Sequence, residues 1–150
     1  MLENYKWKNR VARKYYIEGK TVLEPQDDAA YFNLGGKWRM PTNDEWTALL
    51  NTKKNTEDYT WTWCDGSAEK YEGTDVEGWK IVRNSTSATL FLPAAGDRVG
   101  VTFRRSIGLY WSSTLKKTSE SAGCLSFDSE KVRMYVYDLY YGLSIRPVSD

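Results

Sequence analysis

Near its C-terminal end the chain reads Val132-Arg133-Met134-Tyr135-Val136-Tyr137-Asp138-Leu139-Tyr140-Tyr141-Gly142-Leu143-Ser144-Ile145-Arg146-Pro147-Val148. Four of the eleven tyrosines in the chain fall within this stretch. In a strand, the apolar residues of its first part would share one face: Val132, Met134 and Val136. The opposite face would carry Arg133, Tyr135 and Tyr137. One face therefore suits a core, and the other presents the two residue types that are enriched at binding hot spots. We predict that the rest of the chain is a scaffold for this display.

Length and composition indicate one globular domain spanning residues 1–150. The chain is 41% hydrophobic and 27% charged, which predicts an ordered core. The net charge of +1 gives no electrostatic case for nucleic-acid binding. No stretch approaches the roughly 20 apolar residues of a membrane span, so no membrane insertion is expected. Residues 1–20 contain no apolar run, which means that this chain shows no signal peptide.

The chain has no histidine, which removes Ser-His-Asp and Cys-His catalysis and histidine-ligated zinc from consideration. Its two cysteines, Cys64 and Cys124, are expected to be small buried apolar residues rather than a disulfide framework. The acidic loop at residues 65–77 lacks the spacing and the closing glutamate of an EF-hand. We therefore predict no cofactor and no metal site.

The first twenty residues are basic, with aromatic side chains interleaved among the lysines and arginines. This pattern would suit an arm that binds nucleic acid or another anionic surface. The near-neutral balance of the whole chain favours the other interpretation, a solvated segment that tucks its aromatic side chains into the domain.

Two short helices are predicted in the first third of the chain. Pro25 and the acidic residues after it suit the start of a helix over residues 25–34, which Gly35 and Gly36 would end. Its inner side would carry Ala29, Ala30 and Phe32. A second helix over residues 43–50 begins at a capping box, Thr42 with Glu45, and would bury Trp46, Leu49 and Leu50. Arg39 could bind a ligand, but a structural hydrogen-bond donor beside the helix start is the stronger interpretation.

Short strands follow the helices. The expected strands are residues 59–63, 79–82, 88–92, 108–113, 122–127, 132–137 and 143–148, with Trp111 buried. Turns at residues 84–87 and 128–130 would form two hairpins, and residues 97–107 would form a loop or a ragged strand. Ala94-Ala95-Gly96 suggests a crowded backbone crossing. Helices first and strands later predict an α+β fold with antiparallel sheets and long loops.

Four motifs together resemble a known family. They are Asp27-Asp28-Ala29-Ala30 through Gly35-Gly36-Lys37-Trp38-Arg39-Met40-Pro41-Thr42; Leu90-Phe91-Leu92-Pro93-Ala94-Ala95-Gly96; Gly108-Leu109-Tyr110-Trp111-Ser112-Ser113; and Gly142-Leu143-Ser144-Ile145-Arg146-Pro147-Val148. Their order and spacing, over roughly residues 21–148, resemble the bacterial major paralogous domain family named for Fibrobacter succinogenes. That family is similar to the formylglycine-generating-enzyme branch of the C-type lectin-like fold.

The resemblance implies a C-type lectin-like domain with two helices beside twisted antiparallel sheets. It also implies a binding role at the cell surface of gut bacteria or on a phage particle, and further sequence before residue 1, including an early strand. Some similar proteins are the variable proteins of diversity-generating retroelements, whose variable segment would match residues 133–140 and residues 99–105. The reactive cysteine pair of the enzyme branch and the calcium-site tripeptides of sugar-binding lectins are absent, so neither activity carries over.

The resulting hypothesis is a non-catalytic ligand-binding domain for receptor recognition or adhesion. Its predicted ligand-binding residues are Arg133, Tyr135, Tyr137, Asp138, Leu139, Tyr140, Arg104 and Arg105. The partner would be a protein or a glycan, and the domain a monomer or weak oligomer. For Tyr140 and above all Tyr141, packing against Trp111 as part of the core is the competing interpretation.

Two other functions remain open from the sequence. Asp97 and Asp138 could be an acid/base pair of a glycan-active enzyme, although nothing in the sequence places them together. The domain could also be a structural subunit of a surface fibre or phage tail, with its exposed aromatic side chains as an assembly interface.

Overall fold

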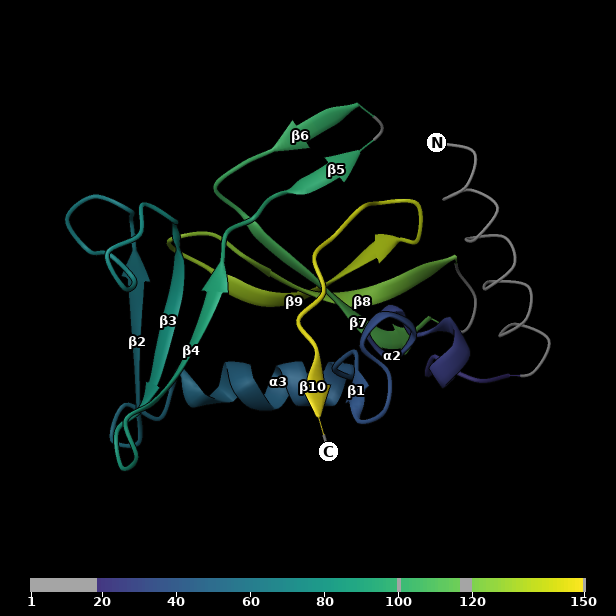
Figure 1. Ribbon diagram of the computed structural model, residues 1–150, viewed down its shortest axis with the longest axis horizontal. Coiled ribbons are helices and arrows are strands. Elements are labelled where there is room, and N and C mark those ends of the chain that lie inside the picture. The colour runs from purple at the N-terminus through teal and green to yellow at the C-terminus, as the bar shows by residue number, and fades with distance from the viewer. Residues whose placement is uncertain (1–18, 100, 117–119, 150) are drawn as a thin grey trace.

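The chain forms a mixed α+β domain in a computed structural model that describes residues 19–99, 101–116 and 120–149 (Figure 1). The helical elements are η1 (Pro25–Asp27, 3-10), α2 (Ala29–Leu34) and α3 (Asn43–Thr52). The strands are β1 (Trp38–Arg39), β2 (Tyr59–Cys64), β3 (Gly78–Arg83), β4 (Ala88–Pro93), β5 (Asp97–Val99), β6 (Thr102–Arg104), β7 (Gly108–Leu115), β8 (Ser121–Phe127), β9 (Val132–Asp138) and β10 (Val148–Ser149). The predicted α+β class with antiparallel sheets is confirmed. Except for Gly19 and Lys20, the basic segment predicted at residues 1–20 lies outside the described residues.

Two three-stranded antiparallel sheets make up most of the domain, in the strand orders β2-β3-β4 and β7-β8-β9. Figure 1 shows the first sheet at one end of the molecule, the second crossing its middle, and α3 running along one side of both. The short pairs β1-β10 and β5-β6 complete the strand pairing. The two hairpins predicted from turn residues are present, β3-β4 and β8-β9.

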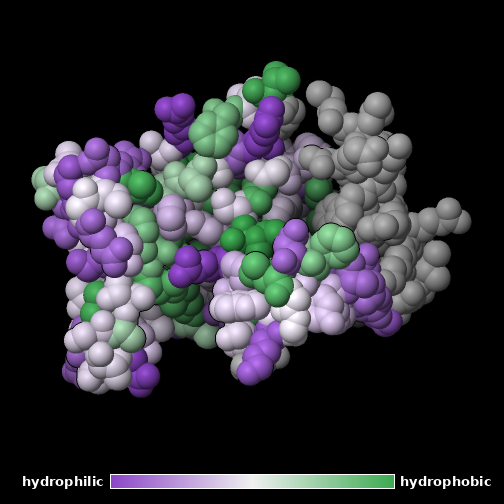
Figure 2. All heavy atoms as spheres, viewed as in Figure 1, coloured by the Kyte–Doolittle hydropathy of each residue, from purple (hydrophilic) through white to green (hydrophobic). Residues whose placement is uncertain are grey.

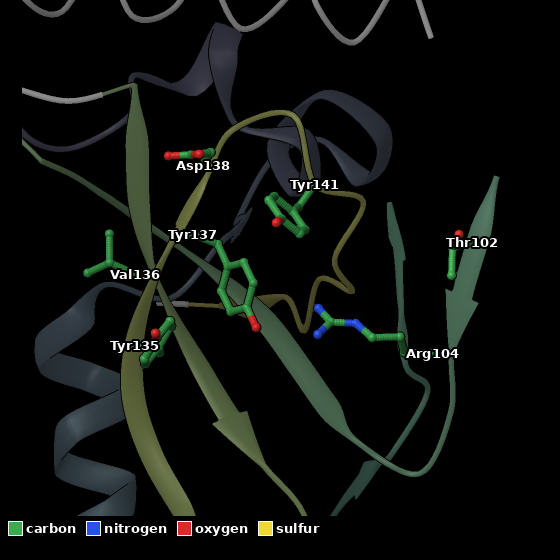
Figure 3. Close-up of a pocket in the computed structure, with 7 residues that line it drawn as sticks. All are labelled: Thr102, Arg104, Tyr135, Val136, Tyr137, Asp138 and Tyr141. Carbon is green, nitrogen blue, oxygen red and sulfur yellow. The ribbon is translucent and has the colours of Figure 1, made fainter. Parts of the chain in front are cut away.

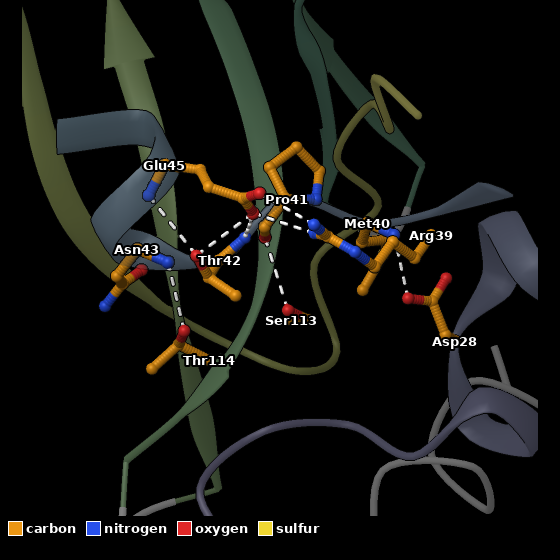
Figure 4. A network of polar contacts seen from close by, with 9 residues as sticks. All are labelled: Asp28, Arg39, Met40, Pro41, Thr42, Asn43, Glu45, Ser113 and Thr114. Atoms are coloured by element: carbon orange, nitrogen blue, oxygen red, sulfur yellow. Dashed lines mark hydrogen bonds and ion pairs between the residues drawn. The ribbon is translucent and has the colours of Figure 1, made fainter. Parts of the chain in front are cut away.

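The start of α3 is fixed by the predicted capping box (Figure 4). The Thr42 hydroxyl accepts the backbone N–H of Glu45 at 3.2 Å, and the Glu45 carboxylate accepts the backbone N–H of Thr42 at 2.8 Å. Arg39 donates to both carboxylate oxygens of Glu45 at 2.8 Å. Arg39 is therefore the structural donor beside the helix start that the sequence favours, and the capping box is confirmed.

The helix predicted over residues 25–34 is divided in two at Asp28. The side chain of Asp28 caps α2 by accepting the backbone N–H of Ala30 at 2.8 Å. Its other oxygen accepts the backbone N–H of Met40 at 2.8 Å, so this buried carboxylate also fixes the chain before α3. Gly35 ends α2 at a positive φ of 69°, as predicted. Phe32 is 78% exposed and does not lie on the inner side of the helix, because α2 is only six residues long and buries only Ala30.

The larger core lies between α3 and the two main sheets. Trp46 of α3 packs there with Leu125 and Phe127 of β8, and Leu49 and Leu50 lie against the same cluster, as the helix spacing predicted. A smaller core forms under α2 from Leu23, Ala30, Met40, Leu115, Ala122 and Leu139. Both cysteines are free and buried, as expected, and burial raises the pKa of the Cys124 thiol to about 12.

Strand β9 alternates as predicted for most of its length, and Val136 is the exception. Two predictions outside β9, for Trp111 and for the last strand, are also corrected. Val132 and Met134 pack against the larger core, but Val136 is 38% exposed, because its partner in β8 is Gly123, whose space is taken by the Asn43 side chain. Trp111 is half-buried rather than buried. The predicted last strand over residues 143–148 is reduced to β10, because residues 143–147 make only one isolated bridge, at Ser144.

The Arg39–Glu45 pair predicts a pH-dependent contribution to stability. Hydrogen bonding to Arg39, and then to Thr42, lowers the pKa of Glu45 from 4.5 to about 2. A carboxylate with a lowered pKa stabilises the fold above its unfolded pKa and loses that contribution as the pH falls toward the folded value. Near pH 7, Glu45→Gln should lower the free energy of unfolding by about 0.5–1 kcal/mol, a range that allows for solvent screening of this exposed pair.

In urea titrations, the difference between wild type and Glu45→Gln should shrink as the pH approaches about 2. Glu57→Gln, a change at an exposed glutamate outside α3, is the control and should show no such trend. A difference that stays constant with pH would contradict the assignment.

Candidate functional site

The chain that follows β9 turns back across the β7-β8-β9 sheet and joins it to the β5-β6 hairpin. Arg98 and Gly142 exchange both backbone hydrogen bonds at 2.9 Å. Ser144 donates its N–H to the carbonyl of Leu109 at 3.0 Å and accepts the N–H of Trp111 at 2.9 Å. We call residues 139–145 the return segment. The backbone of the return segment therefore connects the β5-β6 hairpin to the β7-β8-β9 sheet, although no strand of one pairs with a strand of the other.

An open pocket of about 550 Å³ lies between β9 and β6, at the side of the return segment (Figure 3). Its lining residues are Thr102, Arg104, Tyr135, Val136, Tyr137, Asp138 and Tyr141. In Figure 3 the rings of Tyr137 and Tyr141 and the guanidinium of Arg104 point toward one another across the space between the strands. The strand predicted to display binding residues thus forms one wall of a concave site.

Four tyrosine rings form a continuous row beside this pocket. The ring centroids are 5.3 Å apart for Tyr135 and Tyr137, 4.9 Å for Tyr137 and Tyr141, and 4.6 Å for Tyr140 and Tyr141. The guanidinium of Arg133 extends the row, 5.2 Å from the centroid of the Tyr135 ring. Rings in such contact restrict one another, so the row presents a large aromatic surface at low entropic cost.

The opposite wall depends on one buried carboxylate. Asp97 is 2% exposed, and its oxygens accept hydrogen bonds from Nε of Arg104, at 2.7 Å, and from Nη2. Hydrogen bonds to Asp97 and to the Tyr137 hydroxyl raise the pKa of Arg104. Asp97 therefore fixes the guanidinium on one side, and the remaining edge of the guanidinium faces Tyr137 and the pocket.

Gly96 allows the tight approach of the two strands that carry this pair. Its φ is +78°, and a Cβ at this position would lie 1.9 Å from the carbonyl oxygen of Arg104. Only glycine fits such a backbone contact. The crowded crossing predicted from Ala94-Ala95-Gly96 is therefore real, and it places Arg104 in the wall of the pocket.

The predicted binding residues fall into three groups. Arg104, Tyr135, Tyr137 and Asp138 line the pocket. Arg133 and Tyr140 lie next to it through the tyrosine row, whereas Arg105 points elsewhere, with its guanidinium 5.9 Å from the centroid of the Phe103 ring. Leu139 is a correction: it is only 6% exposed and belongs to the smaller core. Its N–H still bonds the carbonyl of Glu120, so the alternation of β9 continues one residue further and places Leu139 on the same face as Tyr137, where the smaller core buries it.

Three lining residues were not among the predicted ligand-binding residues. Thr102 lies on β6, a strand whose alternation with Arg104 is too short to recognise from sequence. Val136 was assigned to the core. For Tyr141, packing against Trp111 is the competing interpretation from the sequence; its ring joins the row beside the pocket and also borders a smaller apolar cavity of about 200 Å³ that includes Trp111.

Charged groups near the site are few. Among the described residues, no three His, Cys, Asp or Glu side chains gather as a metal ion would require. A hydrogen bond to Tyr141, followed by desolvation, raises the pKa of Tyr140 to about 12. Asp97, one half of the acid/base pair considered from sequence, is engaged by Arg104, and Asp138 is the one carboxylate among the lining residues of the pocket.

Comparison with protein-family models, curated proteins and solved structures gives no match for this chain. In the part of the chain that the structure describes, none of the helices has both the length and the apolar character needed to cross a membrane.

The Asp97–Arg104 pair makes a stability prediction that separates two neighbouring arginines. Arg104→Ala would leave the buried carboxylate of Asp97 without its partner and should lower the free energy of unfolding by about 3 kcal/mol. Arg105→Ala removes an exposed side chain and should change it by less than about 0.5 kcal/mol. Chemical denaturation of the two variants and the wild type measures both values. Equal effects of the two substitutions would contradict the assigned role of Asp97.

Proposed function

We propose that this chain is a non-catalytic ligand-binding domain whose ligand occupies the pocket between β9 and β6. The observation that carries the proposal is the convergence of Tyr135, Tyr137 and Tyr141 with Arg104 in one concave site. The volume of about 550 Å³ lies within the range of ligand pockets, roughly 300–1,000 Å³. Tyrosine and arginine are also the residue types that contribute most at protein interfaces.

The geometry of the site supports binding rather than chemistry. Its principal cation, Arg104, is held on a buried carboxylate, and the ring contacts hold the tyrosines in position. A site that is ordered before the ligand arrives avoids part of the entropic cost of binding. Aromatic rings with hydroxyl groups can pack on apolar surface and hydrogen-bond at its margin, which suits a protein segment or a glycan.

We further propose that the domain has the C-type lectin-like fold and belongs to the major paralogous domain family named for Fibrobacter succinogenes. The support is the order of the four motifs together with the α+β arrangement of short helices and antiparallel sheets. On that basis the domain would act at a bacterial cell surface or on a phage particle, in receptor recognition or adhesion, as a monomer or weak oligomer.

The segment from Arg133 to Tyr140 is proposed to be the variable part of a diversity-generating system. The support is that most of its side chains can be replaced without loss of core packing: Arg133, Tyr135, Val136, Asp138 and Tyr140 are exposed. Tyr137 is half-buried, and Met134 and Leu139 pack against the larger and the smaller core. Variation in relatives should therefore spare Met134 and Leu139.

A subunit of a surface fibre or phage tail is the second candidate, and one observation favours it. The tip of the β5-β6 hairpin carries Val101, which is 87% exposed, and Phe103, which is 54% exposed. Figure 2 shows hydrophobic spheres projecting at that tip, away from the mass of the domain. Under this candidate function, the hairpin tip would be an assembly contact.

The test begins with binding of the labelled domain to a glycan array and to a phage library of random linear peptides. For whichever binder is found, Tyr137→Ala should weaken binding about tenfold or more, and Tyr135→Ala should also weaken it. Phe32→Ala, at an exposed ring on α2, is the control and should bind as the wild type does. Wild-type affinity in both tyrosine variants would show that the pocket is not the binding site.

Light scattering, which measures the oligomeric state, distinguishes the second candidate function from the first. A stable oligomer that Phe103→Ser converts to a monomer would favour the fibre or tail subunit. A monomer in both proteins would favour the ligand-binding domain.

A further inference from the structure

The apolar cavity of about 200 Å³ lies between the return segment and the smaller core. The return segment contributes Leu143 and Ile145 to its lining, and the smaller core contributes Met40, Leu115 and Ala122. Voids larger than a water molecule are few in protein interiors, because side chains there are close-packed. A space of this size among core residues is therefore a candidate for a binding site.

The lining of the cavity suits hydrocarbon better than water. Its polar side chains among the described residues include Asp27 and Ser112, and both are engaged. The Ser112 hydroxyl donates to the side-chain oxygen of Asn43 at 2.7 Å and accepts the backbone N–H of Thr114 at 3.1 Å. A buried water needs about two to four polar partners, whereas apolar cavities stay dry and take up hydrocarbon ligands.

Two contacts place the cavity directly beside the pocket between β9 and β6. Tyr141 lines both spaces, and its ring lies 4.9 Å from that of Tyr137, which it faces in Figure 3. In the sheet, Ala122 of the cavity is the register partner of Tyr137 of the pocket. The half-buried side chain of Tyr141 is thus a shared wall, and its rotation about the Cα–Cβ bond would join the two spaces.

We propose that the cavity is a subsite of the ligand pocket and that it receives one apolar side chain, of the size of leucine or phenylalanine, from a protein ligand. The remainder of the ligand packs on the rings of Tyr135 and Tyr137 beside Arg104. This inference rests on the proposed function, because it assigns a ligand class to the same site.

The volume and the lining of the cavity together select that group. An apolar cavity of about 150 Å³ holds benzene in another protein, so about 200 Å³ accommodates a phenyl ring or a leucyl side chain. A sugar ring carries hydroxyl groups on most of its carbon atoms, and each would lose its hydrogen bonds to water on entering an apolar cavity. The cavity therefore favours a protein segment over a glycan, a choice that the open pocket alone leaves undecided.

Filling the cavity from inside the protein gives the sharpest variant, Ala122→Leu. Ala122 is 2% exposed, so the three added carbon atoms must enter the cavity, where they should not lower the stability of the fold. Ala29→Leu fills the cavity from α2, at a residue that does not line the pocket. The matched control is Ala88→Leu, the same substitution at an exposed position of β4.

Benzene is the first probe. Added to the wild-type domain, it should shift the methyl NMR signals of Leu115 and Leu139, which line the cavity. The shifts should be absent in Ala122→Leu and in Ala29→Leu and unchanged in Ala88→Leu. Urea titrations of all four proteins verify that each is folded.

The second probe is a dodecamer taken from the random linear peptide library by selection on the wild-type domain. Selected peptides should share one leucine, phenylalanine or methionine, and replacing it with alanine should weaken binding to the wild type about tenfold or more. Both cavity-filling variants should bind the selected peptide about tenfold more weakly, and Ala88→Leu within about twofold. In the filled variants the alanine replacement should have little further effect, because the two changes remove the same contact.

Other results would overturn the inference. Peptides that bind both filled variants as well as the wild type, yet lose affinity for Tyr137→Ala, would show a ligand that uses the pocket without the cavity. A loss in Ala122→Leu alone would trace the effect to the neighbouring Tyr137 and would also contradict the subsite. A glycan that binds, with no peptide selected, would contradict the ligand class. In these three cases the proposed function stands, whereas it fails with the inference if no ligand depends on Tyr135 or Tyr137.

Discussion

The paired backbone hydrogen bonds between Arg98 and Gly142 are the contact on which the candidate site depends. The β5-β6 hairpin and the β7-β8-β9 sheet share no strand pairing, and the return segment that passes between them is hydrogen-bonded to both. Ser144 fixes that segment to β7 through two further backbone bonds. Since main-chain bonds do not depend on side-chain identity, the walls of the pocket are held by atoms that substitutions in its lining leave in place. This separation between frame and surface is what a domain with exchangeable contact residues would require.

The features predicted correctly from the sequence are those determined by short-range physics. The capping box of Thr42 and Glu45 needs only three residues of spacing, and the alternation around Val132 and Met134 needs only one strand. The turn at residues 84–87 likewise follows from local turn preferences and correctly predicts the β3-β4 hairpin. The prediction of the site residues also rested on local spacing, because Tyr135 and Tyr137 share a face in any strand that includes them. Their place in a binding surface could therefore be proposed before the fold was known.

The remaining predictions needed contacts between distant parts of the chain. Asp28 interrupts the first helix because its carboxylate also binds the N–H of Met40, twelve residues further on. Leu139 looked like part of an exposed loop, yet it fills the core beneath α2. The role of Arg104 depends on its pairing with Asp97 across a short hairpin. Val136 was assigned inward by alternation alone, but Asn43 occupies the space in front of Gly123, so no pocket for Val136 exists in the core. In each case the local pattern was compatible with the structure, and a tertiary contact decided the outcome.

The central claim is that the return segment holds the two walls of the pocket in place before any ligand binds. Native-state hydrogen exchange of the free protein tests it most directly, at the amides of Arg98 and Gly142. If the two walls are held together, both amides should exchange only through large openings, as slowly as the core amides of β8. Exchange at these two amides as fast as in exposed loops, while β8 stays protected, would show that the hairpin moves independently of the sheet and that the pocket is not preformed.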